Sequence, residues 1–148
     1  MKKRLLLICT GNSARSIMAE AIVRSERGDR WEVESAGSEP KGVHPMSLKA
    51  LREDGIETEG LNSKHLSTFK GRQFDLVVTL CGNAAEACPF FPGAKQQIHL
   101  GFDDPAAATG SDEDILAGFR RVRDDIKVKL IRFLDEFQPS ANIPKPEV

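Results

Sequence analysis

The apolar residues of this chain fall into short continuous runs separated by stretches with helical spacing. Continuous runs at residues 3–8 and 75–80 predict strands buried on both faces of a parallel sheet, and shorter segments at 31–35 and 97–100 predict two more strands. Spacing of three and four predicts helices at residues 14–27 and 45–55. It also predicts a closing helix whose apolar face carries Ile115, Phe119, Val122, Ile126, Leu130, Phe133 and Phe137. This alternation indicates one doubly wound α/β domain, with a parallel sheet of about four strands flanked by helices.

Turn and cap signals place the remaining boundaries. Ser67 is expected to cap a short turn that runs through Phe69, and a helix is expected from about Asn83 to Pro89. Residues 101–110 form a predicted loop, and Pro139 ends the closing helix. The expected domain therefore spans residues 1–137, and the proline-rich residues 138–148 are expected to be a mobile tail.

Composition narrows the class of protein. The 148 residues fit one domain, and 21 basic against 22 acidic side chains give a net charge of −1. No global basic field attracts nucleic acid or an anionic membrane, so any anion must be held locally. Three cysteines are too few for a disulfide scaffold. The early apolar run stops at Gly11, short of the roughly 7 to 15 apolar residues of a signal peptide, so we expect a cytoplasmic protein.

The segment after the first predicted strand has the composition of an anion-binding loop. It reads Cys9-Thr10-Gly11-Asn12-Ser13-Ala14-Arg15-Ser16, and we call it the oxyanion loop. Successive N–H groups in such a strand-to-helix turn bind a tetrahedral anion, assisted by the helix dipole. Arg15 could clamp two anion oxygens, the positive surroundings favour a Cys9 thiolate, and Ser16 could donate to that sulfur. The plainer alternative is a buried cysteine beside an arginine at a helix start.

Other reactive residues follow the later strands. Cys81 comes after the strand at 75–80, and Asp103 and Asp104 come after the last predicted strand. Because the carboxyl ends of parallel strands meet at one edge of a sheet, these residues are expected near Cys9.

Five motifs together support a resemblance to a known family. They are CTGNSARS from Cys9, SAG at 35–37, LVVTLC ending in Cys81, Cys88-Pro89, and GFDDPA at 101–106. The chain resembles the thioredoxin-coupled arsenate reductases, which are similar in fold to the low-molecular-weight protein tyrosine phosphatases. The resemblance implies reduction of arsenate to arsenite for arsenic detoxification, with residues 10–16 binding the oxyanion.

The resemblance also implies a relay of three cysteines. Cys9 would attack arsenate, and Cys81 would then attack the Cys9 sulfur, releasing arsenite and forming a Cys9–Cys81 disulfide. Cys88 would move the bridge outward as Cys81–Cys88, and thioredoxin would reduce it. Neighbouring parallel strands lie about 4.8 Å apart, which suits the first exchange. No bound cofactor and no metal are expected, and the protein is expected to be a monomer.

The spacing of Cys81 and Cys88 predicts a conformational change. Seven helical residues rise about 10.5 Å, whereas a disulfide spans Cα atoms no more than about 7 Å apart. If the segment is helical when reduced, it must unwind before the cysteines can bridge. We therefore expect the segment from Cys81 to about Pro92 to loop out on oxidation.

Asp104 is implied by the resemblance to be the general acid, because it precedes proline in the family motif. Asp103 is the competitor from the sequence alone, and acidic pairs in loops are commonly solvated turn residues or N-caps. By the same resemblance, Asn12 would brace the oxyanion loop through side-chain hydrogen bonds, helped by Ser35.

Two positions depart from the pattern of relatives. Many carry a further cysteine where this chain has Ala14, and its absence removes a thiol that could form a dead-end bridge. Some are assisted by a potassium ion held partly by an acidic side chain at the position of Lys64. A lysine would repel that ion, so we expect equal kinetics in sodium and potassium buffers.

Three other readings remain open at this stage. A tyrosine phosphatase would use the same loop and Asp104, although Ala106 and Ala107 replace the aromatic residues that usually follow the Asp-Pro motif. A non-catalytic oxyanion-binding redox sensor would need no general acid. A zinc site would combine the three cysteines with His44, His65 or His99, but no cysteine pair has the usual spacing of two to four residues.

Overall fold

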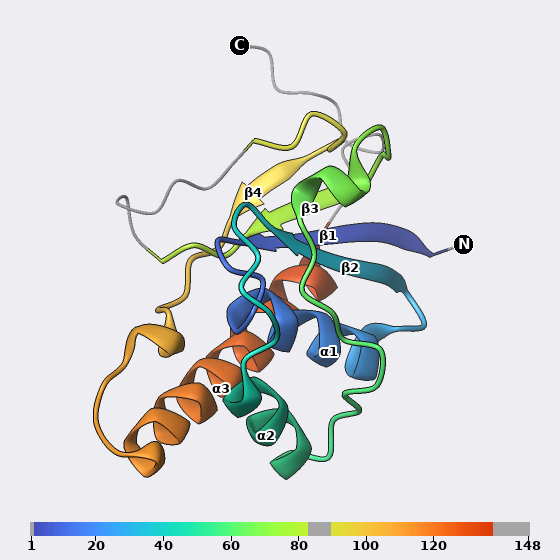
Figure 1. Cartoon of the computed structure of the whole chain (residues 1–148). Coiled ribbons are helices and arrows are strands. Elements are labelled where there is room, and N and C mark those ends of the chain that lie inside the picture. Colours follow the sequence, from blue (N-terminus) through green and yellow to red (C-terminus); the bar gives the residue numbers. More distant parts are fainter. Residues whose placement is uncertain (1, 83–89, 138–148) are drawn as a thin grey trace.

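A four-stranded parallel sheet forms the centre of the molecule in a computed structural model that describes residues 2–82 and 90–137. The strands are β1 (Lys3–Cys9), β2 (Trp31–Gly37), β3 (Leu76–Thr79) and β4 (Gln97–His99), arranged in the order β2-β1-β3-β4 (Figure 1). All neighbours pair in parallel, which confirms the predicted sheet. β2 is two residues longer than predicted because it pairs with β1 as far as Cys9 and Gly37.

Three α-helices lie on one side of this sheet (Figure 1). They are α1 (Arg15–Arg27), α2 (Pro45–Glu53) and α3 (Asp112–Glu136), close to the predicted segments. Proline at the first position begins α2, and a capping box of Ser111 and Asp114 begins α3. The described chain contains no helix that is both long and apolar enough to span a membrane.

Two short 3₁₀ helices correct the predicted loops. η1 (Leu66–Phe69) is capped by His65, whose Nδ1 accepts from Ser67 N at 2.9 Å. The prediction that Ser67 is the cap was therefore wrong, because the imidazole nitrogen two residues earlier takes that role. η2 (Pro105–Ala107) lies within the predicted loop 101–110. The helix expected at 83–89 and the tail at 138–148 lie outside the described residues.

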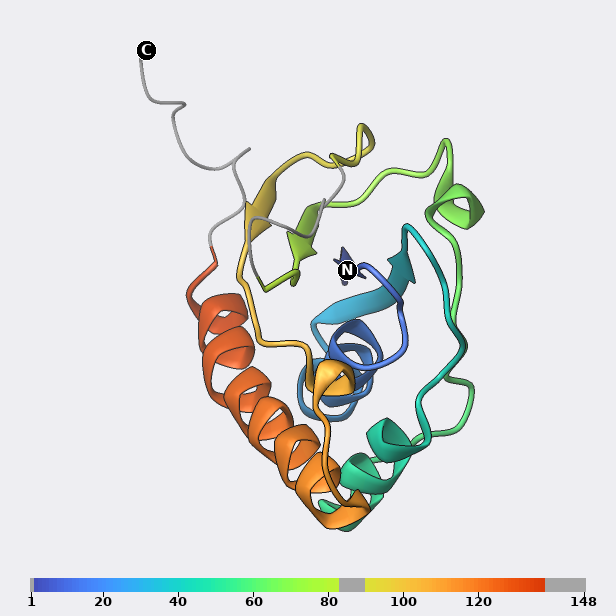
Figure 2. The same ribbon diagram turned by 60° about the vertical axis from the view of Figure 1, so that its left-hand side comes forward.

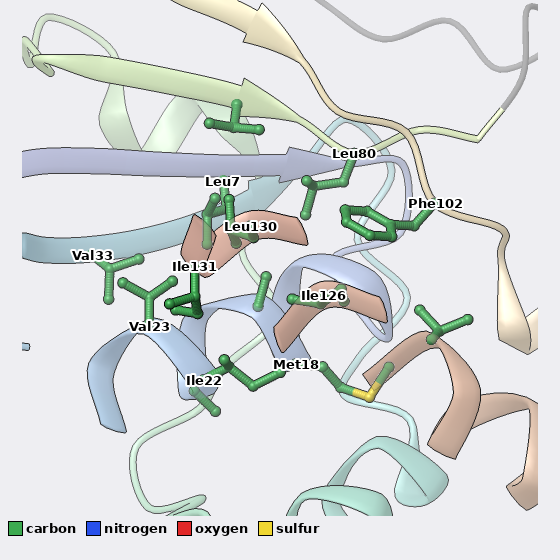
Figure 3. Close-up of a cluster of buried hydrophobic side chains, with 14 of the residues drawn as sticks. Leu7, Met18, Ile22, Val23, Val33, Leu80, Phe102, Ile126, Leu130 and Ile131 are labelled. Atoms are coloured by element: carbon green, nitrogen blue, oxygen red, sulfur yellow. The ribbon is translucent and has the colours of Figure 1, made fainter. Parts of the chain in front are cut away.

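Alternating side chains of β1 build two hydrophobic clusters. Leu5 and Leu7 pack with the buried faces of α1 and α3, in the cluster shown in Figure 3. Leu6 and Ile8 pack in the second cluster, with phenylalanines from η1 and from the segments beside β3 and β4. The continuous apolar run of β1 is thus explained by burial on both faces, as predicted.

The parallel arrangement brings the loops after β1, β3 and β4 to one edge of the sheet. Ile8 is in register with Thr79, which is in register with His99. Figure 2 shows η2, which follows β4, beside the first turn of α1. The candidate reactive residues of all three loops therefore meet at this edge.

Candidate active site

A small cavity lies at the carboxyl edge of β1. Its volume is about 100 Å³, and its lining comprises Cys9, Thr10, Gly11, Ser13, Ala14, Arg15, Lys41, Asp104 and Ala106. Pockets for drug-sized ligands measure roughly 300 to 1,000 Å³, so this cavity suits a small ion. The structure therefore brings most of the oxyanion loop together with Asp104.

The backbone of the oxyanion loop turns its carbonyl groups outward, toward residues 39–44. Thr10 O accepts from Glu39 N at 2.9 Å, and Gly11 O accepts from Lys41 N at 2.9 Å. Ser13 O accepts from His44 N at 3.1 Å. In a planar trans peptide the N–H points opposite to the carbonyl, so these contacts direct the following N–H groups inward. This is the orientation that an anion-binding loop requires.

The first turn of α1 differs from that of α3. No side chain of the described residues caps α1 at Ala14, and its first turn contains no acidic residue. By contrast, α3 has a capping box and three acidic residues in its first turn. A helix N-terminus carries partial positive charge, and the first turn of α1 contains no carboxylate of its own to neutralise it. An anion in the cavity would meet that charge.

Cys9 is a buried free thiol at the end of β1. Its Sγ lies 2.9 Å from Ser16 Oγ, the contact predicted from the sequence. Ser16 Oγ also accepts from Asn12 Nδ2 at 2.7 Å, and its own hydrogen is available to donate to a Cys9 thiolate. A hydrogen bond from a hydroxyl group favours a thiolate over a neutral thiol.

Asn12 holds the shape of the loop. It is fully buried and has a φ of 43°, a left-handed conformation that asparagine tolerates better than most residues. Its Nδ2 donates to Ser35 Oγ at 3.0 Å, and its Oδ1 accepts from Lys64 N at 2.7 Å. The expected bracing by Asn12 and Ser35 is therefore present. The side chains of Asn12 and Ser16 support the loop from behind, since neither residue lines the cavity.

Arg15 and Asp104 form the charged wall of the cavity. Arg15 Nη2 lies 3.7 Å from Asp104 Oδ2, and Nη1 donates to Phe102 O at 3.3 Å. Asp104 caps η2 through a 3.0 Å bond from Ala106 N and keeps its side chain 37% exposed. Of the acidic pair, the described cavity lining includes Asp104 rather than Asp103.

Cys81 lies beside the oxyanion loop. It is buried just after β3. Its Sγ is 3.8 Å from the Oγ1 atom of Thr10, the residue that follows Cys9 in the sequence. Cys81 is disulfide-bonded, whereas Cys9 is free. The predictions for Cys88, which include its place in a zinc site, lie outside the described residues.

Two residues at the site were missed from the sequence. Lys41 lines the cavity from the loop after β2, and its only signal was a basic residue following a strand that ends at the same edge. Glu20 is 1% exposed on α1 and accepts from Ser35 Oγ at 2.5 Å. Its position within the apolar stretch of the helix was a signal for burial. Within residues 2–82 and 90–137, no group of three or more His, Cys, Asp or Glu side chains could hold a metal ion.

Comparison with known proteins places the chain in a family. The model of the low molecular weight phosphotyrosine protein phosphatase family matches residues 4–142, which is nearly the whole chain. The chain belongs to this family. Its phosphatase-like fold agrees with the predicted resemblance.

Proteins named arsenate reductase are among the relatives of this phosphatase-family member. The chain is 47% identical to one from Halalkalibacterium halodurans over 134 residues, covering 90% of this chain and 96% of that protein. It is 44% identical to one from Bacillus subtilis over 133 residues, with the same coverage. A solved structure described as an arsenate reductase in the phosphate binding state superposes with a TM-score of 0.74 at 26% identity, covering 93% of this chain and all of that one.

Proposed function

We propose that this protein is a thioredoxin-dependent arsenate reductase that uses a three-cysteine relay. The observation that carries the proposal is the placing of a second cysteine beside a complete oxyanion cavity. Cys9, Arg15 and Asp104 line the cavity, and Cys81 lies next to it across Thr10. Ester hydrolysis by a phosphatase needs the first three groups and leaves Cys81 without a task. The names of the relatives support the same reaction.

The first step joins arsenic to Cys9. The Cys9 thiolate attacks arsenate held by Arg15 and the loop N–H groups, and Asp104 gives its proton to a departing oxygen, which leaves as water. Preorganised donors stabilise the charge that develops on the arsenate oxygens. Lys41 adds a second positive charge at the cavity wall.

The second step reduces arsenic. Cys81 attacks the Cys9 sulfur, and the electron pair of the sulfur–arsenic bond stays with arsenic, which leaves as arsenite. The two thiols are oxidised by two electrons to the Cys9–Cys81 disulfide. Cys88 then attacks Cys81, which frees Cys9 and forms Cys81–Cys88, and the dithiol of thioredoxin reduces that bridge.

The test is production of arsenite with thioredoxin, thioredoxin reductase and NADPH. We expect Cys9→Ser and Cys81→Ser to abolish turnover, and Cys88→Ser to stop after a single turnover because its Cys9–Cys81 bridge stays buried. Sustained turnover by Cys88→Ser would contradict the proposed relay. Normal arsenite production by both Cys81→Ser and Cys88→Ser would show that neither cysteine takes part in the reduction.

Weak phosphatase activity is a second candidate function, and one observation favours it. A further cavity of about 450 Å³ adjoins the first and shares Ser13, Lys41, Asp104 and Ala106 with it. Space of this size admits the organic part of a phosphate monoester. Hydrolysis of p-nitrophenyl phosphate should require Cys9, Arg15 and Asp104 and should survive in Cys81→Ser. A redox sensor without catalytic activity would show neither hydrolysis nor arsenite production.

A further inference from the structure

A buried carboxylate that the proposed chemistry does not use lies behind the oxyanion loop. Glu20 is on α1, one turn after Ser16, and its side chain is 2% exposed. Burial raises the pKa of Glu20, and Glu34 raises it further, whereas the hydrogen bond from Ser35 and the charges of Lys64 and Arg24 lower it. Burying a charged carboxylate away from water is unfavourable unless other groups pair with it, so the contacts of Glu20 must explain its position.

A chain of hydrogen bonds connects Glu20 to the Cys9 sulfur. Ser35 gives its only hydroxyl hydrogen to Glu20 Oε1 at 2.5 Å and therefore accepts from Asn12 Nδ2 at 3.0 Å. The second Nδ2 hydrogen of Asn12 goes to Ser16 Oγ at 2.7 Å. The hydrogen of Ser16 is then left for Cys9 Sγ at 2.9 Å. With Glu20 ionised, Ser35 must donate to it, and the two Asn12 hydrogens go to Ser35 and Ser16.

Lys64 contacts this chain at two points, Glu20 and Asn12. Its Nζ lies 3.8 Å from Glu20 Oε1, with the lysine side chain only 21% exposed. Its backbone N–H donates to Asn12 Oδ1 at 2.7 Å, and its carbonyl accepts from Gly37 N at 2.9 Å. The backbone of Lys64 thus orients the Asn12 amide, while its ammonium group faces the carboxylate at the far end.

Lys64 also differs from the other cation at Glu20. Arg24 is an i, i+4 neighbour on α1 that forms an ion pair with Glu20, but its side chain is 40% exposed. Lys64 instead reaches Glu20 from the loop before η1, and Nζ is further held by Asn62 O at 3.0 Å. Exposed charges are screened by solvent more than buried ones, so Lys64 is the better placed to keep Glu20 ionised.

We propose that Lys64 and Glu20 are positioning residues for the Cys9 nucleophile, in which a tethered ammonium group keeps a buried carboxylate charged. The charged carboxylate keeps Ser35 donating to Glu20 and polarises the Ser35–Asn12–Ser16 chain, which supports donation from Ser16 to the Cys9 thiolate. Neither residue lines the cavity, and both act through the loop. The inference rests on Cys9 being the nucleophile of the proposed function, but it concerns the thiolate and not arsenic.

The test measures the pH dependence of Cys9 alkylation by iodoacetamide in the full chain carrying Cys81→Ser and Cys88→Ser, so that Cys9 alone reacts. In Lys64→Ala, we expect the midpoint of alkylation to move to higher pH by about 0.5 to 1 unit, a loss of about three- to tenfold in rate below the midpoint. Lys64→Arg should retain most of the normal profile. Lys49→Ala, which removes an exposed lysine of α2, is the matched control and should change nothing.

Two further measurements separate a charge effect from damage to the fold. Methylammonium ions, which match the head group of lysine, should restore the midpoint in Lys64→Ala when sodium ions do not. Glu20→Gln keeps the shape of Glu20 but removes its charge, so it should show the shifted midpoint without rescue. An unchanged midpoint in Lys64→Ala would overturn the proposal, and so would equal shifts in Lys64→Arg and Lys64→Ala. Because no arsenate is used, either outcome is independent of whether the protein reduces arsenate.

Discussion

At the scale of single residues, the site depends on side chains whose hydrogen bonds or charge a similar residue could not reproduce. Asn12 supplies two donors and one acceptor in a left-handed conformation, which no apolar residue of its size could do. Lys64 stands where the sequence led us to expect repulsion of potassium, and its ammonium group lies 3.8 Å from Glu20. Charge type and donor geometry therefore decide the roles of these residues.

Arg15 gives the first prediction at this scale. Arg15→Lys keeps the positive charge but loses the planar pair of donors that fits a tetrahedral anion. A hydrogen bond to a charged group contributes about 1.5 to 3 kcal/mol, so kcat/KM for arsenate should fall by about 10- to 100-fold. Steady-state arsenite production measures the loss. Arg120→Lys, on a surface arginine paired with Glu53 at 2.8 Å, should be normal; an equal loss there would show that the effect is not specific to the site.

Glu20 gives a prediction about stability and pH. Burial raises the pKa of Glu20 in the folded state above its ordinary value, so the folded protein holds that proton more tightly than the unfolded chain. The stability that protonated Glu20 contributes is fully present below its pKa in the unfolded chain. It is lost as the pH rises through its pKa in the folded protein. Urea unfolding of wild type and Glu20→Gln should show wild type losing stability relative to the variant as pH rises. A difference that stays constant with pH would contradict the raised pKa.

At the scale of elements, the site depends on close approach between the end of β2 and the oxyanion loop. Gly37 is paired with Cys9, and a Cβ there would lie 2.5 Å from Thr10 O and 2.9 Å from Asn12 N. Both contacts are with backbone atoms, which cannot move without changing the loop. The glycine of the SAG motif is thus explained by contact between elements and not by turn geometry.

Two glycine-to-alanine substitutions should therefore have opposite effects on the stability of the protein. Gly37→Ala should cost about 1 to 3 kcal/mol of unfolding free energy and most of the activity, because the oxyanion loop must shift. Gly118→Ala lies within α3, where an added Cβ would lie 3.7 Å from Arg121 Nη2, an ordinary van der Waals contact with a flexible side chain. It should stabilise the protein by about 0.5 to 1 kcal/mol with normal activity. Chemical denaturation and arsenite assays test both, and an active Gly37→Ala would refute the packing argument.

At the scale of the whole molecule, a nearly neutral protein concentrates positive charge at one edge of its sheet. The net charge is −1, yet Arg15, Lys41 and the first turn of α1 surround the cavity. Three separate loops meet there because all four strands run in parallel. The local concentration of positive charge is therefore a consequence of the topology, and it needs no basic surface elsewhere.

The domain boundary gives the prediction for the whole molecule. Phe137 follows α3 and packs against Trp31 and Phe133, with ring centroids 5.7 and 6.1 Å away. A chain that ends at Phe137 should retain its melting temperature and activity. A chain that ends at residue 132 should melt at a markedly lower temperature, with a red shift of the fluorescence of Trp31, the one tryptophan of the sequence. Equal stability of the two shortened chains would place the boundary elsewhere.

The sequence by itself determined the parallel sheet, the three long helices and the oxyanion loop. These features follow from local patterns, since apolar runs, helical spacing and cap residues act within one element. The Cys9–Ser16 contact could be predicted because both ends lie in one loop. The position of Cys81 near that loop followed from the rule that carboxyl ends share an edge.

Only the tertiary structure decided which distant residues complete the site. It placed Asp104 rather than Asp103 in the cavity wall, brought Lys41 to its lining, and joined Glu20 to Lys64 across 44 positions of sequence. It also made His65 the cap of η1 in place of Ser67. Side chains that hydrogen-bond between loops carry no periodic signal, because their partners are set by how the loops pack and not by the spacing within them.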